Sequence, residues 1–238
     1  RGFNNLEMRQ RRRDAAVFVI IWLCVVGAAC WSLSSDEAVS PKHAVHHVAV
    51  TGVLGAVILC LAYSMTRICR SLIVMVDAFC GDTLGEMQLQ QLTHYWNTTQ
   101  AVLRKVSNDL ETCLLVLCAL LALSVPAIVV DLAVLGASSD DVLKLLPSVF
   151  VTGAILYALL IASAVSEKCV RVPALINAIA VDSDNVRARQ HLVDYIKSSA
   201  AGFYIFDTRL TTSMVVKFTY VWCIVVAGGL SRVASSEP

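Results

Sequence analysis

The sequence predicts an all-α integral membrane protein, a helical bundle that crosses the bilayer about five times. Of its 238 residues, 57% are hydrophobic and only 16% are charged, and the mean hydropathy is +0.70. Soluble domains are about 45–50% apolar and about 25% charged. Backbone groups in lipid must be hydrogen-bonded internally and strand-like alternation is absent, so we expect the spans to be helices.

Five apolar runs are each long enough to cross the hydrocarbon core, which takes about 20 residues of helix. The first run carries no charged residue, the third contains Pro126, and the fifth is uncharged except for Lys217. The runs cover residues 15–33, 44–65, 113–130, 145–166 and 210–230.

The distribution of Lys and Arg predicts the orientation, because basic residues favour the cytoplasmic side of a membrane. With the N-terminal side inside, the outer segments hold only Lys42, Lys144 and Arg232 of the 19 basic residues, and Lys217 lies within a span. We therefore expect cytoplasmic long loops and an extracellular C-terminus. The glycosylation sequence that begins at Asn97 would then be cytoplasmic and unmodified.

The predicted cytoplasmic segments contain helices with one apolar face, which extend the spans into a cytoplasmic bundle. Apolar or small residues recur at alternating spacings of three and four between the second and third spans, which is typical of packed helices. An amphipathic helix lying on the membrane would give the same pattern. We expect this stripe to form subunit contacts that charged substitutions at Leu92 and Leu103 would break. It consists of Leu89, Leu92, Trp96, Thr99, Leu103, Val106 and Leu110.

No enzyme signature is present, so we expect neither catalysis nor a cofactor. The nine Cys residues lack metal-ligand spacing, and the net charge of +1 gives no reason to expect a nucleic-acid partner. Lys217 and Asp131 are the ionisable residues in the spans, and each could sit at an interface. His43, His46 and His47 have a spacing that could hold a metal or sense pH. Polar residues at an interfacial helix start are commoner, so we predict no metal site.

The last apolar run has a narrow face of small or branched residues. This face suits close packing between helices, and it equally suits a pore wall where copies of one helix surround an axis. The face consists of Thr212, Val216, Thr219, Cys223, Val226 and Leu230.

Aromatic residues in or near the other spans could line a ligand cavity between helices. Ordinary packing and membrane-interface positions are the alternatives. The residues are Trp22, Trp31, Tyr63, Phe150 and Tyr157.

The C-terminal third resembles the signature of the insect gustatory and odorant receptor family. The match comprises a Gly-Phe pair, a short FD-x-x-L segment and a Thr-Tyr pair within the last span, at the family's spacing. Val226 and Ala227 stand where the family usually has Gln-Phe. The matching residues are Gly202, Phe203, Phe206, Asp207, Leu210, Thr219 and Tyr220.

The resemblance implies a seven-span chemoreceptor of which this chain holds five spans, and the chain begins at Arg1 without a start Met, as a piece of a longer protein would. It assigns residues 1–66 to spans three and four and 67–109 to cytoplasmic anchor helices. Spans five and six fall in residues 110–166. Residues 167–206 then form the rest of the cytoplasmic anchor and a half-helix. The pore helix begins at Asp207 within the last segment, 207–238, which ends in an extracellular tail.

The family is one of ligand-gated, weakly selective cation channels of the plasma membrane, so the resemblance implies a taste or odour receptor of this kind. Such channels are tetramers of one subunit or of related subunits, and the last helix lines the pore. A small tastant or odorant binds in the outer half of each subunit, and the protein is surrounded by membrane lipid. Cys223 would stand at the apolar constriction, within the pore face formed by Val216, Thr219, Cys223, Val226 and Leu230.

Two other classes of membrane protein compete with a channel. A multi-span scaffold, or a receptor subunit without its own pore, would use the face of the last span for packing only. A G-protein-coupled receptor would have an intracellular C-terminus and the DRY and NPxxY motifs, which are absent from the sequence. Transporters more often show inverted repeats or broken helices, and the sequence shows neither.

Overall fold

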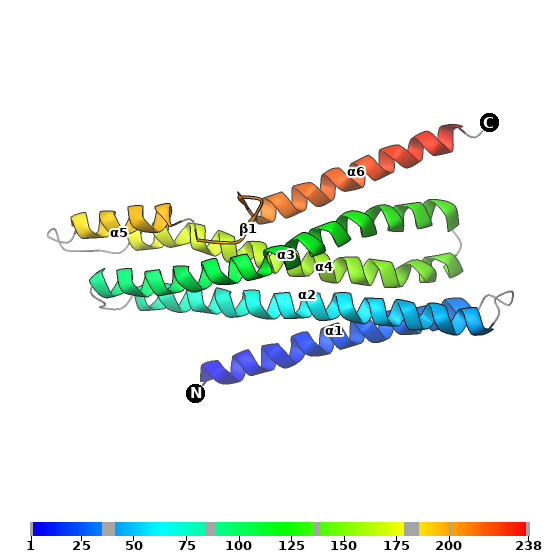
Figure 1. Ribbon diagram of the computed structural model, residues 1–238, viewed down its shortest axis with the longest axis horizontal. Helices are drawn as coiled ribbons and strands as arrows, with labels where there is room; N and C mark the ends of the chain where they lie inside the picture. Colours follow the sequence, from blue (N-terminus) through cyan, green and yellow to red (C-terminus); the bar gives the residue numbers. More distant parts are fainter. Residues whose placement is uncertain are drawn as a thin grey trace. The chain divides into compact units, whose positions relative to one another are not determined.

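The protein is built from long α-helices, which the computed structural model describes over residues 2–34, 41–83, 89–135, 139–178, 186–199 and 201–236. Side chains are described for 12–31, 45–46, 48–81, 91–128, 130, 145–178, 186–199, 201–225 and 227–228. The helices in these ranges are α1 (Gly2–Ser34), α2 (Pro41–Thr83), α3 (Leu89–Leu135), α4 (Ser139–Ala178), α5 (Val186–Ser198) and α6 (Thr212–Ser236) (Figure 1).

Four helices of the described residues are long and apolar enough to cross a bilayer, which makes the chain a multi-pass membrane protein. Their candidate spans fall in α1 to α4 and have a mean hydropathy of 2.2 each. They confirm the first four predicted runs as apolar helices. In α6 the described apolar stretch is the shorter Thr212–Val225, so a fifth crossing stays a prediction.

The chain divides into two compact units, and several long helices contribute to both. Unit 1 comprises Arg1–Ser64, Val116–Ala158 and Val216–Pro238, and unit 2 comprises Met65–Leu115 and Leu159–Val215. Unit 2 contains both segments, 67–109 and 167–206, that the family resemblance assigned to an anchor. The cytoplasmic location of that anchor is still a prediction.

In unit 1, α1 packs along α2 through a seam of small and aromatic residues (Figure 1). Gly52 presents its carbonyl oxygen to the indole Nε1–H of Trp22 at 3.2 Å. Phe18 and Tyr63 meet edge to face, with ring centroids 5.4 Å apart. A Cβ added at Gly55 would lie 3.4 Å from the Val25 side chain, so the small residue lets the two helices approach closely.

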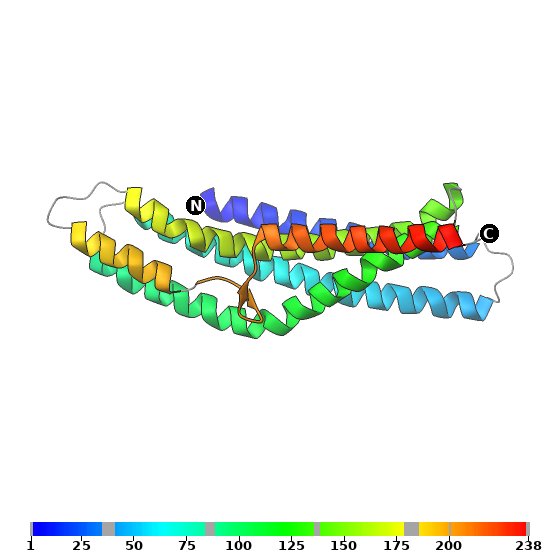
Figure 2. The same cartoon turned by 90° about the horizontal axis from the view of Figure 1, so that it is seen from above.

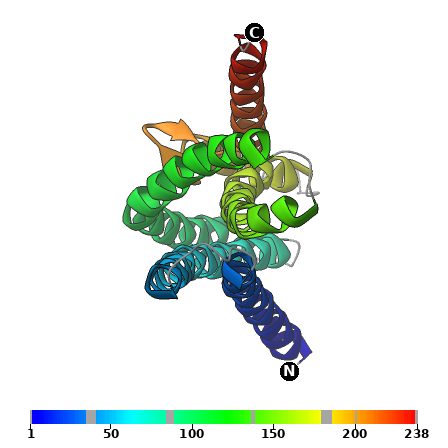
Figure 3. The ribbon, with the colours of Figure 1, turned by 90° about the vertical axis from the view of Figure 1, so that its right-hand side faces the viewer.

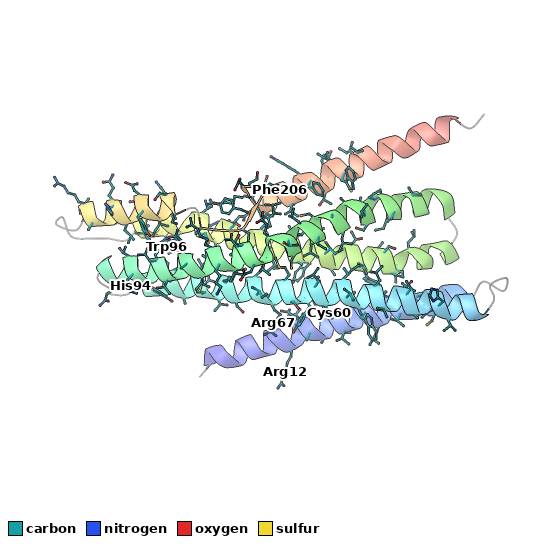
Figure 4. The ribbon with its side chains drawn as sticks, in the orientation of Figure 1. Arg12, Cys60, Arg67, His94, Trp96 and Phe206 are labelled. Atoms are coloured by element: carbon teal, nitrogen blue, oxygen red, sulfur yellow. The ribbon has the colours of Figure 1, made fainter. Side chains whose placement is uncertain are left out.

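In unit 2, the core joins α2, α3, α4 and α5. Phe79 of α2 packs against Trp96 of α3 with the two rings tilted at 52°, and both side chains are fully buried. The Trp96 indole donates to the hydroxyl of Ser199, which directly follows α5, at 3.2 Å. Figure 2 shows α5 beside the first half of α3, and Figure 4 shows Trp96 between these two helices. Lys168 of α4 pairs with Asp77 of α2 at the surface of this unit.

The apolar stripe predicted along the start of α3 packs against the chain's own helices. Leu92, Trp96, Thr99 and Leu103 are all at most 3% exposed, which confirms the predicted helix packing. Leu92 and Leu103 are therefore not available to another subunit, and the expectation that they form subunit contacts is wrong. Leu89, at the start of the stripe, lies outside the described side chains.

A short β-hairpin occupies the segment around Asp207, where the last helix was predicted to begin. Its strands are β1 (Tyr204–Ile205) and β2 (Thr208–Arg209), paired antiparallel. Figure 3 shows the hairpin as arrows beside α3. The last helix thus begins at Thr212 and not at Asp207, because Asp207 occupies the hairpin turn with a φ of 61°.

Candidate functional site

The segment that leads into α6 is held by the motif residues Gly202 and Phe203. Phe203 is 1% exposed, and its backbone N–H donates to the hydroxyl of Ser166 on α4 at 2.9 Å. Gly202 has a φ of 143°, and a Cβ at this position would lie 3.2 Å from the Ser166 Oγ. Gly202 is therefore required by its backbone conformation and by its close approach to α4, while Phe203 contributes a buried side chain.

The hairpin turn holds two non-glycine residues in the left-handed region. Phe206 has a φ of 47° and Asp207 a φ of 61°, as at the central positions of a type I′ turn, where Asn and Gly are preferred. The Leu210 N–H donates to the Phe203 carbonyl at 2.9 Å and closes the hairpin. Phe206 is 76% exposed at the tip, where Figure 4 labels it. Positive φ at a bulky residue is costly and persists where the surrounding structure enforces it.

The N-terminus of α6 is tied to α4 by polar contacts within unit 2. Thr211 caps the helix, accepting the Met214 N–H at its hydroxyl at 3.2 Å. The Thr212 N–H donates to Glu167 Oε1 at 3.1 Å, a negative charge at the positive end of the helix dipole. The hydroxyls of Thr212 and Ser163 lie 2.9 Å apart. These contacts satisfy backbone donors that a helix start would otherwise leave without a partner.

The residues of α6 that were predicted to line a pore differ in how far the rest of the chain covers them. Thr219 is half-buried and Cys223 is exposed, while Val216 is 53% and Tyr220 66% exposed. Val215, which is not a member of the predicted face, is the one buried side chain among those described for α6. Val226 and Leu230 belong to the predicted face but lie outside the described side chains.

Within unit 1, α6 is held to α3 by a hydrogen bond that Pro126 makes available. Proline has no N–H, so Pro126 leaves the carbonyl of the residue four positions earlier, Ala122, without its helical partner. The Trp222 indole Nε1–H donates to this Ala122 carbonyl. Phe218 stacks on Trp222 at a ring-centroid distance of 6.4 Å. The packed face of α6 therefore runs through Trp222, to one side of the predicted pore face.

The aromatic residues predicted as ligand contacts lie in several different places of unit 1. Trp22 and Tyr63 belong to the seam between α1 and α2, where each has a packing or hydrogen-bonding partner. Trp31 is 60% and Tyr157 39% exposed, and Phe150 is half-buried. A role in packing explains Trp22 and Tyr63, and a shared ligand cavity for all five stays a prediction.

The ionisable candidates of the sequence are only partly described. Lys217 is exposed on α6, and by helical geometry it points about 100° away from Val216. His46 is exposed, whereas the side chains of His43, His47 and Asp131 lie outside the described residues. Among the residues described, no group of three His, Cys, Asp or Glu side chains could hold a metal ion.

Several residues that position α6 were missed by the sequence reasoning. Ser163, Ser166 and Glu167 place three polar groups on one face of an otherwise apolar helix, at i, i+3 and i+4. That spacing was a detectable signal of a polar contact. The pairing of Trp222 with the carbonyl freed by Pro126 had no such signal, because it joins residues 100 positions apart.

Comparison of the chain with protein-family models finds no match, and comparison with curated proteins finds none either.

Proposed function

We propose that the chain is a subunit of a ligand-gated, weakly selective cation channel of the chemosensory type, in which α6 of each of four copies lines the pore. The observation that carries this proposal is the exposure of α6. A helix with such an apolar sequence leaves most of its described surface uncovered by its own chain. The resemblance to gustatory and odorant receptors in the same segment supports the same assignment.

The exposed residues of α6 surround most of the helix. Ile224 and Val225 are 53% and 55% exposed, and Val221 is 56% exposed. Such a surface must be covered by lipid or by other copies of the chain, because exposed apolar area is unfavourable in water. Copies arranged around an axis would cover one side of α6 and leave the other to lipid and to the neighbouring helix α3.

The contacts that hold the N-terminus of α6 are consistent with a helix that is fixed at this end and pivots about it. Its N-terminus is held by Glu167 and Ser163 of α4, and farther along it the Trp222 indole is bonded to Ala122. A ligand that binds better to the state with splayed helices would shift the population toward an open pore. A ring of apolar side chains at the level of Cys223 would close the pore by dewetting.

A scaffold or a receptor subunit without its own pore is the second candidate, and Lys217 favours it. Four Lys217 ammonium groups facing one axis would repel cations. In the channel assignment Lys217 lies off the axis, consistent with its angular separation of about 100° from Val216. It would then extend toward the polar boundary of the membrane, as long basic side chains do.

Disulfide cross-linking at Cys223 tests the proposed arrangement without knowledge of the ligand. Cys223 is exposed in the chain, so copies that meet around an axis bring Cys223 thiols together. Copper phenanthroline should then produce a covalent dimer of chains in membranes, measured on a non-reducing gel. A disulfide forms readily only where the two Cα atoms approach within about 7 Å.

The control is Cys60, which is also exposed but lies on α2. The dimer should disappear in Cys223→Ser and persist in Cys60→Ser. A dimer that depends on Cys60, or no cross-linking at Cys223, would contradict α6 as the central helix and support the scaffold.

A further inference from the structure

A polar groove follows one face of α3 in unit 2. Its narrower part has a volume of about 230 Å³ and lies between α3 and the β-hairpin, with Glu111 and Asp207 in its lining. The wider part has a volume of about 470 Å³ and includes Lys105 and Tyr195. Both parts share Gln100, Arg104 and Asn108 in their linings, so they adjoin along α3 and are treated together as one groove.

The charges in this groove are partly separated by sign. The acidic residues Glu111 and Asp207 line only the narrower part, whereas Lys105 lines only the wider part and Arg104 borders both. Arg104 and Glu111 are seven residues apart on one helix, which corresponds to about 10 Å along the axis. Among the described residues, the ion pairs lie elsewhere, at Lys168–Asp77 and Arg171–Glu167, so these four side chains form no ion pair with one another.

The walls of the groove are held by hydrogen bonds that leave its charged groups available. The Gln100 side chain donates to the Ser199 carbonyl at 3.0 Å, and the Tyr195 hydroxyl donates to Asn97 Oδ1 at 2.6 Å. Asp207 is fixed in the left-handed region at the hairpin turn. A site whose walls are already ordered loses less entropy when it binds a ligand.

We propose that this groove binds a small zwitterion, with an ammonium group toward Glu111 and Asp207 and a carboxylate toward Arg104 and Lys105. A ligand with only an anionic group would meet the repulsion of the two acids, and a cationic one that of the two bases. An apolar ligand would desolvate all four charges without compensation. The proposal goes beyond the channel function and does not require a pore, because binding alone tests it.

A series of ω-amino carboxylic acids measures the length that the groove accepts. The purified full-length protein in lipid nanodiscs is titrated with glycine, γ-aminobutyrate and ε-aminocaproate in a calorimeter. We expect ε-aminocaproate to bind more tightly than glycine, since the charges are separated by about 10 Å along the helix. Hexylamine and hexanoate carry one charge each and should bind about tenfold more weakly than ε-aminocaproate, a difference of one charged contact.

Charge-removing variants then place the ligand in the groove. Arg104→Gln and Glu111→Gln should each weaken ε-aminocaproate binding by about tenfold. Arg187 and Asp109 are exposed and outside the groove lining, so Arg187→Gln and Asp109→Asn are matched controls that should bind as the unmodified chain does. The proposal is overturned if ε-aminocaproate binds no better than hexylamine or hexanoate. It is also overturned if it does not bind at all, or if the groove variants and the control variants behave alike.

Discussion

Replacing Trp96 by Ala should lower the free energy of unfolding by about 3–5 kcal/mol, the range for removing a large aromatic side chain from a core. Trp96 is fully buried, and its ring lies 5.1 Å from that of Phe79. It also donates to the Ser199 hydroxyl, so the substitution removes one of the contacts that join α3 to the end of α5. Denaturant unfolding in detergent, followed by near-ultraviolet circular dichroism, measures the loss.

Two further variants separate packing from hydrogen bonding at this position. Trp96→Phe keeps an aromatic ring against Phe79 but leaves Ser199 Oγ without its donor, and should cost about 1–3 kcal/mol. Val102 lies on the same helix and is 39% exposed, so Val102→Ala should change stability by only about 0.5 kcal/mol. Equal losses in Trp96→Ala and Val102→Ala would contradict a core centred on Trp96.

Replacing Gly202 by Ala should destabilise the segment before α6 by about 1–3 kcal/mol, the typical range for a strained backbone conformation. The φ of 143° is unfavourable for any residue with a Cβ. The added atom would also press on Ser166, whose hydroxyl accepts the Phe203 N–H. The same thermal or denaturant unfolding experiment measures the effect.

Gly81 provides a control of opposite sign for the Gly202 prediction. It lies within α2, and an added Cβ would meet nothing within 4 Å. Gly81→Ala should therefore stabilise the protein by roughly 0.5–1 kcal/mol, as expected for glycine in a helix. If Gly202→Ala left stability unchanged or raised it as Gly81→Ala does, the left-handed conformation assigned to Gly202 would be wrong.

The long helices could be predicted from the sequence because each combines length, apolar composition and the absence of strand alternation. The start of α6 was placed wrongly because the hairpin strands are only two residues long. Its turn, Phe206-Asp207, also lacks the Asn or Gly that is typical of such a turn and would have indicated it in the sequence. The motif residues Gly202 and Phe203 were recognised by resemblance, but their contact with Ser166 required the fold.

Periodicity predicts that a helix face is buried but not what buries it. The stripe through Leu92 and Leu103 was correctly predicted to pack, yet it packs inside the chain. On α6, the packed face was missed because its Trp222 contact depends on a carbonyl that Pro126 frees on α3. The groove along α3 could not be foreseen either, since Asp207 and Glu111 are brought together only by folding.

Single-particle imaging of the purified full-length protein in gentle detergent tests the central claim most directly, because it requires no ligand. The channel assignment predicts four-fold symmetric particles with a cluster of four helices on the axis, identified as α6 by the side-chain density of Tyr220 and Trp222. Reproducible monomers or dimers, or a four-fold particle with another helix on the axis, would contradict it.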